Sequence, residues 1–159
     1  MPKIVSLKAL QVFDSRGLPT IETEIILDNK KKASAIVPSG ASTGSYEAYE
    51  LRDTQSKKYL GKGVFKAIEK VNGEIFKLLK NFDIEDQSKI DETLIELDGT
   101  KQKKRLGANA ILSVSIAASK VRALSKNLPL YKSIGKGTIL PYPLMNIING
   151  GAHANNSLK

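Results

Sequence analysis

The chain has 159 residues, 41% of them hydrophobic, which is enough for one domain with a buried core. It has no cysteine and one histidine, which excludes disulfides and thiolate metal sites and argues against zinc. The net charge of +9 favours anionic ligands, either phosphorylated metabolites or nucleic acid. No apolar run approaches the ~20 residues of a membrane helix, and the N-terminus lacks a signal-peptide segment. We therefore expect a cytoplasmic protein with no membrane partner.

The first part of the chain predicts three short strands. They are "KIVSLKALQVF", "TIETEIIL" and "ASAIV", separated by "DSRGLP" and "DNKKK". The second strand alternates, with Glu22 and Glu24 on one side of the sheet. On the other side lie Ile21, Thr23, Ile25 and Leu27. Three successive strands with short links predict an antiparallel meander, which Pro38 ends.

From Gly63 the apolar spacing becomes helical. The residues on the predicted apolar face are Val64, Ile68, Val71, Ile75, Leu78 and Phe82. A second helix, in "SKIDETLIELDGT", presents Ile90, Leu94 and Leu97 and ends at Gly99. A third, from about residue 108 to 126, is small and apolar nearly all round, which indicates burial. The predicted fold class is α+β, a three-stranded antiparallel meander followed by helices.

The last part of the chain has a different character. After Asn127 comes "LPLYKSIGKGTILPYP", a linker-like stretch with three prolines and two glycines. The apolar run in "LMNIINGG" that follows predicts a strand. A strand needs neighbours to be stable, and the sequence offers none after it.

Two glycine-containing segments, "PSGASTG" and "NGGAHANNS", are rich in side-chain oxygen and amide groups. Hydroxyls and unhindered carbonyls suit a hard cation such as Mg²⁺. The same composition is common in flexible connectors, and composition alone favours that interpretation. His153 is by default a surface imidazole, and a substrate contact needs independent support.

The lysine-rich clusters "NKKK" and "KQKKR" leave a second function open. They could belong to a basic, non-catalytic module that binds nucleic acid or an acidic partner, with strongly salt-dependent affinity. No aromatic residue interleaves with either cluster, so solvated turns are favoured and no specific nucleic acid is expected.

Four motifs resemble the enolase family over essentially the whole chain. They are "DSRG" with Pro19, "PSGASTG" before "EAYELRD", "LGANAILSVSIA", and "PYPLMNIINGGAHANN". The resemblance implies an enolase N-terminal-like α+β domain over residues 1–138. Residues 139–159 would hold the linker end, only the first strand of a C-terminal α/β barrel, and the start of a catalytic loop.

Enolases are lyases of glycolysis (phosphopyruvate hydratases) that interconvert 2-phosphoglycerate and phosphoenolpyruvate. They remove a proton next to a carboxylate bound to Mg²⁺, with two Mg²⁺ ions per active site, and they work as homodimers. By resemblance, Ser42 binds the second Mg²⁺ through its hydroxyl and carbonyl. It lies in a closing lid that consists of Ser39, Gly40, Ala41, Ser42 and Thr43.

The resemblance also implies roles for residues outside the lid. His153 and Gly151 would approach the substrate phosphate on a second loop that pivots at Gly150, and Arg16 would lie at the dimer interface. No set of catalytic residues is complete, because the family places most of them on a barrel of ~250 residues. We therefore expect the 159-residue chain alone to be inactive and to bind Mg²⁺ weakly.

Two positions depart from the usual family pattern. Leu18 stands where asparagine is usual, and Ser113 stands where glycine is common. Neither is expected to contact substrate. The segment "LGANAIL" is expected to serve buried helix packing rather than the site itself.

Overall fold

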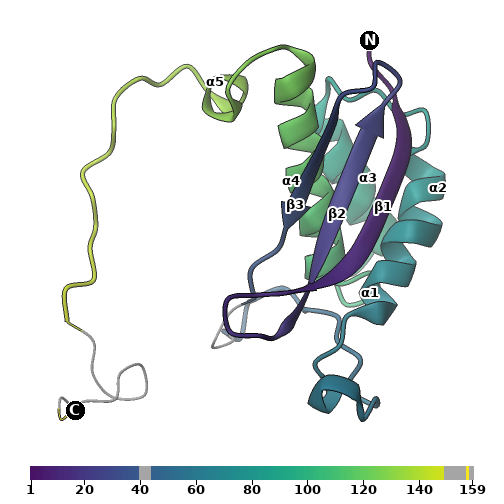
Figure 1. Ribbon diagram of the computed structural model, residues 1–159, viewed down its shortest axis with the longest axis vertical. Helices are drawn as coiled ribbons and strands as arrows, with labels where there is room; N and C mark the ends of the chain where they lie inside the picture. The colour runs from purple at the N-terminus through teal and green to yellow at the C-terminus, as the bar shows by residue number, and fades with distance from the viewer. Residues whose placement is uncertain (40–43, 149–156, 158–159) are drawn as a thin grey trace.

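The computed structural model describes residues 1–39, 44–148 and Ser157. Its strands are β1 (Ile4–Phe13), β2 (Pro19–Leu27) and β3 (Lys32–Ile36). Its helical elements are η1 (Lys58–Gly61), α1 (Phe65–Lys70), η2 (Val71–Ile75), α2 (Phe76–Leu79), α3 (Gln87–Asp98), α4 (Ala108–Ser125) and α5 (Leu130–Ile134). The strands form one antiparallel sheet in the order β1-β2-β3, and the main helices cover one face of it (Figure 1). The predicted α+β class and meander are confirmed.

The predicted alternation along β2 is also confirmed. Ile21, Ile25 and Leu27 are buried against the helices, and Glu22 and Glu24 lie on the opposite, more accessible face. This period of two follows from the strand geometry, in which successive side chains point to opposite faces of the sheet. The sheet therefore has one apolar face, and the helical layer covers it.

The predicted first helix forms as one continuous run from Phe65 to Leu79, but its middle turn, η2, is a π-helix. We expected Leu78 on the buried face, and this is wrong, because Leu79 is fully buried and Leu78 is 38% exposed. A π turn contains one more residue than an α turn, so the residues that follow are rotated around the helix axis. After that turn the buried face therefore continues at Leu79, four residues from Ile75, rather than at Leu78, three residues from it.

The other two predicted helices are confirmed. In α3, Ile90 and Leu94 are fully buried, and Gly99 ends the helix in the left-handed conformation at φ 69°. Helix α4 is buried along most of its length, as its small apolar residues indicate. Its Ser113 hydroxyl lies 2.7 Å from the Thr23 hydroxyl of β2, a fully buried polar contact between helix and sheet.

Side chains and loop backbone reach the edges of the sheet. The carboxamide of Asn72, in the π turn, accepts a hydrogen bond from the Ala9 N–H at 2.7 Å and donates one to the Ala9 carbonyl at 3.1 Å. Ile4 is similarly bonded to the backbone of residues 81 and 82. At the β3 edge, Lys120 Nζ donates to the Ser34 carbonyl at 3.0 Å. The π turn thus places Asn72 where it can bond to the backbone of β1.

The end of the described chain differs from the prediction. The stretch expected to be a linker contains α5, and Arg122 of α4 donates to the carbonyl and hydroxyl of Ser133 in that helix. The strand expected in "LMNIINGG" is not formed by Leu144–Ile148, which have no regular secondary structure. Within the described residues no strand lies beside this segment, which runs away from the domain in Figure 1. Without a neighbouring strand its backbone has no ladder to join.

Candidate functional site

The predicted site residues fall into two groups. Ser39 and Arg16 lie in the described part of the chain. Outside the described residues lie Gly40, Ala41, Ser42, Thr43, Gly150, Gly151 and His153. The structural site is therefore the frame that surrounds residues 40–43.

The backbone leading to Ser39 is fixed at the end of the sheet. The Thr20 hydroxyl donates to the Val37 carbonyl at 2.5 Å, and the Val37 N–H donates to the Ile21 carbonyl at 3.2 Å. The carbonyl of Ser39, two residues after Val37, accepts a hydrogen bond from Arg16 Nη2 at 2.8 Å. The chain thus enters residues 40–43 from a position set by β2 and by the turn between β1 and β2.

That turn is built around Asp14. Its carboxylate accepts the N–H groups of Arg16 and Leu18, both at 2.9 Å, and Gly17 takes a left-handed conformation at φ 72°. The Leu18 N–H is the main cause that holds the pKa of Asp14 below its ordinary value, and the Arg16 hydrogen bonds add to it. Asp14 is therefore anionic beside the Arg16 guanidinium at neutral pH.

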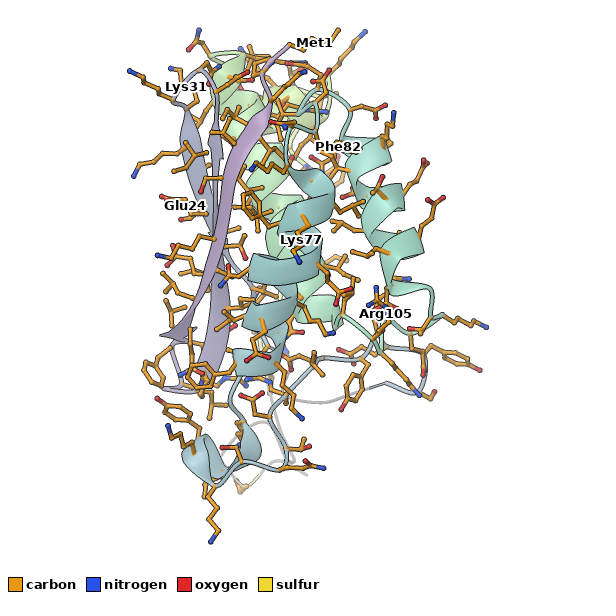
Figure 2. All side chains as sticks on the ribbon, turned by 90° about the vertical axis from the view of Figure 1, so that its right-hand side faces the viewer. Met1, Glu24, Lys31, Lys77, Phe82 and Arg105 are labelled. Carbon is orange, nitrogen blue, oxygen red and sulfur yellow. The ribbon has the colours of Figure 1, made fainter. Side chains whose placement is uncertain are left out.

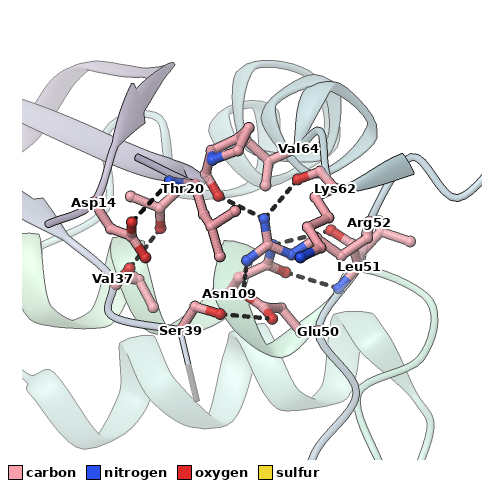
Figure 3. A network of polar contacts seen from close by, with 12 residues as sticks. Asp14, Thr20, Val37, Ser39, Glu50, Leu51, Arg52, Lys62, Val64 and Asn109 are labelled. Carbon is pink, nitrogen blue, oxygen red and sulfur yellow. Dashed lines mark hydrogen bonds and ion pairs between the residues drawn. The ribbon is translucent and has the colours of Figure 1, made fainter. Parts of the chain in front are cut away.

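A second set of contacts reaches Ser39 from the chain that follows residues 40–43 (Figure 3). The Ser39 hydroxyl donates to Glu50 Oε2 at 3.4 Å, and Arg52 Nη2 lies 2.7 Å from Glu50 Oε1. Arg52 Nη1 also donates to the carbonyls of Pro19, at 2.5 Å, and Lys62, at 2.7 Å. Glu50 and Arg52 thus form a polar network that joins both flanks of residues 40–43.

The segment that carries Glu50 and Arg52 is itself fixed against the start of α4. The Asn109 side chain, buried at 3% exposure, accepts from the Leu51 N–H at 3.1 Å and donates to the Leu51 carbonyl at 3.0 Å. The Ala108 N–H donates to the Tyr49 carbonyl at 2.8 Å. Gly107, at φ 93°, lets the two segments approach, since a Cβ there would lie 2.4 Å from the Leu51 Cβ.

Asp53 fixes the other end of this segment. Its carboxylate, in a residue 6% exposed, accepts the backbone N–H groups of Phe65 at 2.8 Å and Lys66 at 3.0 Å, at the start of α1. Satisfying the first N–H groups of a helix with a carboxylate is an effective capping arrangement. Residues 49–53 are thus held by two helices, α1 and α4.

A hollow of about 230 Å³ lies within this frame. Its walls come from both flanks of residues 40–43 and from the start of α4: Val37, Pro38, Glu47, Ala48, Glu50, Ala108, Asn109 and Leu112. Each carboxylate in this lining already has a partner, because Glu47 accepts the Gly44 N–H at 2.9 Å and Glu50 accepts from Ser39 and Arg52. The hollow is therefore a space beside residues 40–43 whose lining carboxylates are already hydrogen-bonded.

The described residues do not fit a magnesium site of their own. They contain no group of three or more histidine, aspartate or glutamate side chains that could hold a metal. A bound Mg²⁺ needs several oxygen donors. An Mg²⁺ ion held here would therefore need oxygen donors beyond the described residues. In addition, no helix in the described ranges is long and apolar enough to span a membrane.

Asn109 has a part in this frame that the sequence alone did not reveal. The segment "LGANAIL" does pack in the core, as expected, but Asn109 also holds Leu51, which is 58 residues away in the sequence. Helical periodicity describes which face is buried and says nothing about such a contact. An amide on an otherwise apolar, buried stretch was the available signal, because buried polar groups need partners.

Comparisons with known proteins agree with this architecture. Residues 4–134 match the family model described as "Enolase, N-terminal domain". The chain is 60% identical over 161 aligned residues to a protein named enolase from Pelagibacter ubique (strain HTCC1062). That match covers all of this chain and 38% of the relative, so the chain spans well under half of the relative's length. The chain belongs to the enolase family.

Proposed function

We propose that this chain acts as the N-terminal part of an enolase that interconverts 2-phosphoglycerate and phosphoenolpyruvate, working as a cytoplasmic homodimer. The observation that carries the proposal is the family match over residues 4–134. The 60% identity to an enolase over the whole chain supports it. The rest of the enzyme, 62% of the relative's length by difference from the 38% covered, would supply most of the groups that act on the substrate.

The frame around residues 40–43 supports a role for this chain at the substrate site. Ser39 on one side and Glu50 on the other are fixed by hydrogen bonds to the sheet turn and to the loop before α1. We propose that Ser39, Gly40, Ala41, Ser42 and Thr43 form a lid over the site and that Ser42 is a magnesium ligand. Small residues there would let the backbone approach a ligand closely.

The second loop contributes His153 and Gly151, pivoting at Gly150, and we propose that His153 approaches the substrate phosphate. Mg²⁺ would supply positive charge beside the substrate carboxylate, where negative charge develops as the proton leaves. This chain's own contribution is to bind the substrate and to exclude water around it. We also propose that Arg16 lies at the homodimer interface, that the N-terminal domain ends at residue 138, and that residues 139–159 begin the next domain.

Activity can be tested by adding 2-phosphoglycerate and Mg²⁺ and following phosphoenolpyruvate by its ultraviolet absorbance. We expect no conversion with the 159-residue chain alone and conversion with the chain joined to the remainder of an enolase. Conversion by the purified chain alone would disprove its predicted inactivity. Absence of conversion by the complete enzyme would disprove the proposed activity.

The role of Ser42 has its own test in the complete enzyme. We expect Ser42→Ala to lower kcat by about tenfold or more, because a metal ligand is lost. Ser88→Ala, at an exposed position on α3, is the matched control and should leave kcat unchanged. Equal activity of the two variants would contradict the assignment of Ser42.

The alternative of a basic binding module gains no support from the structure. Figure 2 shows Lys31 at the upper left, by the sheet, and Arg105 at the right, on the helical side, so the two basic clusters lie apart. Arg105 is also occupied, since its Nη1 lies 2.6 Å from Glu74 Oε2 and its other nitrogens bond to carbonyls at the end of α3. A nucleic-acid footprint requires cations that are clustered and available.

A further inference from the structure

Helix α5 is the last regular element of the described chain, and it is too short to be stable alone. It has five residues, Leu130–Ile134, and none of them is buried. Isolated helices shorter than ~12 residues are marginal in water even when their sequence favours a helix. The interactions that hold α5 in place must therefore come from outside the helix.

The corner between α4 and α5 has a defined backbone. The Leu128 N–H donates to the Ala123 carbonyl at 2.9 Å. The Asn127 N–H donates to the Leu124 carbonyl at 3.1 Å, and Asn127 takes the left-handed conformation at φ 53°. These two bonds and the left-handed residue make a Schellman motif, which ends a helix and turns the chain in one direction. Pro129, with φ −59°, then leads into α5.

One side chain joins this corner to the rest of the domain. Arg122, in the last turn of α4, donates from Nη2 to the Ser133 carbonyl at 2.6 Å and to the Ser133 hydroxyl at 3.2 Å. The last carbonyls of a helix have no partner within it, so the guanidinium caps the end of α5. Arg122 Nη1 also donates to the Glu85 carbonyl, just before α3, at 3.3 Å. A single guanidinium thus ties α5 to both long helices.

These bonds are the main contribution of Arg122, because its burial is unfavourable. The residue is half-buried, and within the described part of the chain its Nε has no hydrogen-bond acceptor. A buried donor without a partner destabilises a fold, so the bonds to Ser133 and Glu85 have to offset that cost. The neighbouring cation Lys126 is ion-paired with the Glu85 carboxylate. Arg122 is therefore the side chain that holds α5.

We propose that Arg122, by fixing α5, sets the direction in which the chain leaves this domain and is thereby a positioning residue for the enolase reaction. The family match ends at residue 134, the last residue of α5, and residues 135–148 have no regular secondary structure. Helix α5 is thus the last fixed element before the rest of the enzyme. It lies at the upper end of α4 in Figure 1, and the β1–β2 turn lies at the lower end of the sheet.

The link to the reaction rests on the proposed function above, in which the rest of the enzyme supplies most of the groups that act on the substrate. Catalysis between two domains depends on their relative placement, because small misplacements of reacting groups lower the rate strongly. A loose α5 would let the two parts take many relative orientations, of which few are productive.

The first experiment measures the distance between α5 and α3 by double electron–electron resonance of spin labels. The chain has no cysteine, so Ser88→Cys and Lys132→Cys, both at exposed positions, can be labelled selectively. We expect a narrow distance distribution in the labelled chain and about a twofold broader one when Arg122→Met is added. Lys101→Met, which removes an exposed cation before the other end of α4, is the matched control and should leave the width unchanged.

Equal widths in Arg122→Met and Lys101→Met overturn the proposal, as does a broad distribution in the labelled chain without either substitution. This result does not depend on catalysis, because it is measured on the 159-residue chain without substrate.

The second experiment measures kcat/KM in the complete enzyme, at a temperature at which circular dichroism shows every variant to be folded. We expect Arg122→Met to lower kcat/KM by about threefold to tenfold, the equivalent of one lost hydrogen bond. Ser133→Ala removes only the hydroxyl bond and should cost less, and Arg122→Lys, which keeps a donor, should restore part of the loss.

A lower Tm in Arg122→Met with unchanged kcat/KM would give Arg122 a purely structural role and overturns the proposal. If the unsubstituted complete enzyme converts no 2-phosphoglycerate, the proposed function fails, and the spin-label distances still judge whether Arg122 fixes α5.

Discussion

Replacing Gly107 by alanine tests how tightly residues 49–51 are held against α4. Gly107 has φ 93° and ψ 135°, a backbone conformation that costs a residue with a side chain about 1–3 kcal/mol of strain. Its new Cβ would lie 2.4 Å from the Leu51 Cβ and 2.6 Å from Asn109 Oδ1. Relief of that overlap costs about 1–3 kcal/mol and breaks the Leu51–Asn109 hydrogen bonds, at about 1 kcal/mol each. We expect a total loss of at least about 4 kcal/mol in the free energy of unfolding.

Gly17→Ala separates the two contributions. Gly17 also has a positive φ, 72°, so alanine there carries a conformational cost, but a Cβ there meets no atom within 4 Å. We expect it to lose only about 1–2 kcal/mol. The assay is urea unfolding of both variants by far-ultraviolet circular dichroism, with the m-value compared to check that the transition is the same. Losses within about 1 kcal/mol of each other would show that the Leu51 contact does not constrain Gly107.

The remaining predictions concern buried polar groups. Burial raises the pKa of Asp98, but hydrogen bonds from Thr100 and Leu106 outweigh this effect and hold the pKa below 3.8. The ionised Asp98 therefore stabilises the fold above about pH 4, and this stability is lost as the pH falls through the pKa of the folded state. Urea unfolding between about pH 6 and pH 2 should show weaker pH dependence in Asp98→Asn, and identical profiles would contradict the assignment. In a double-mutant cycle, Thr23→Val and Ser113→Ala should couple by about 0.5–1.5 kcal/mol, whereas additive losses would mean that the 2.7 Å contact contributes nothing.

Local patterns in the sequence predicted most of the fold. Alternation identified the strands, and Gly99 marked the end of α3 correctly, because these signals depend on neighbouring residues. Leu78 was misplaced because the π turn changes the helix period where Asn72 reaches Ala9, and no local pattern announces that contact. The strand in the last part failed for a related reason, since pairing partners are not a property of the segment itself.

The candidate site was less predictable than the fold. The resemblance pointed to the correct region, but Arg16 bonds to a carbonyl 23 residues away, and a backbone carbonyl leaves no trace in the sequence. The Glu50–Arg52 pair was more accessible to prediction, because the two opposite charges are only two residues apart in the sequence. Asn109 could be identified only as a buried amide that needed some partner.

The side-chain bonds at the edge of β1 have a consequence for how copies of this domain could associate. A fourth strand adding to β1 would have to displace Asn72 from Ala9 and the backbone of residues 81 and 82 from Ile4. Exposed strand edges are the usual starting points of fibrils, which grow because each added strand presents a fresh edge to the next. The β3 edge carries one such bond, from Lys120 Nζ to the Ser34 carbonyl, so strand addition there would displace a single side chain and would join two copies about a two-fold axis. The Asn72 contact thereby limits aggregation through the sheet to a closed pair.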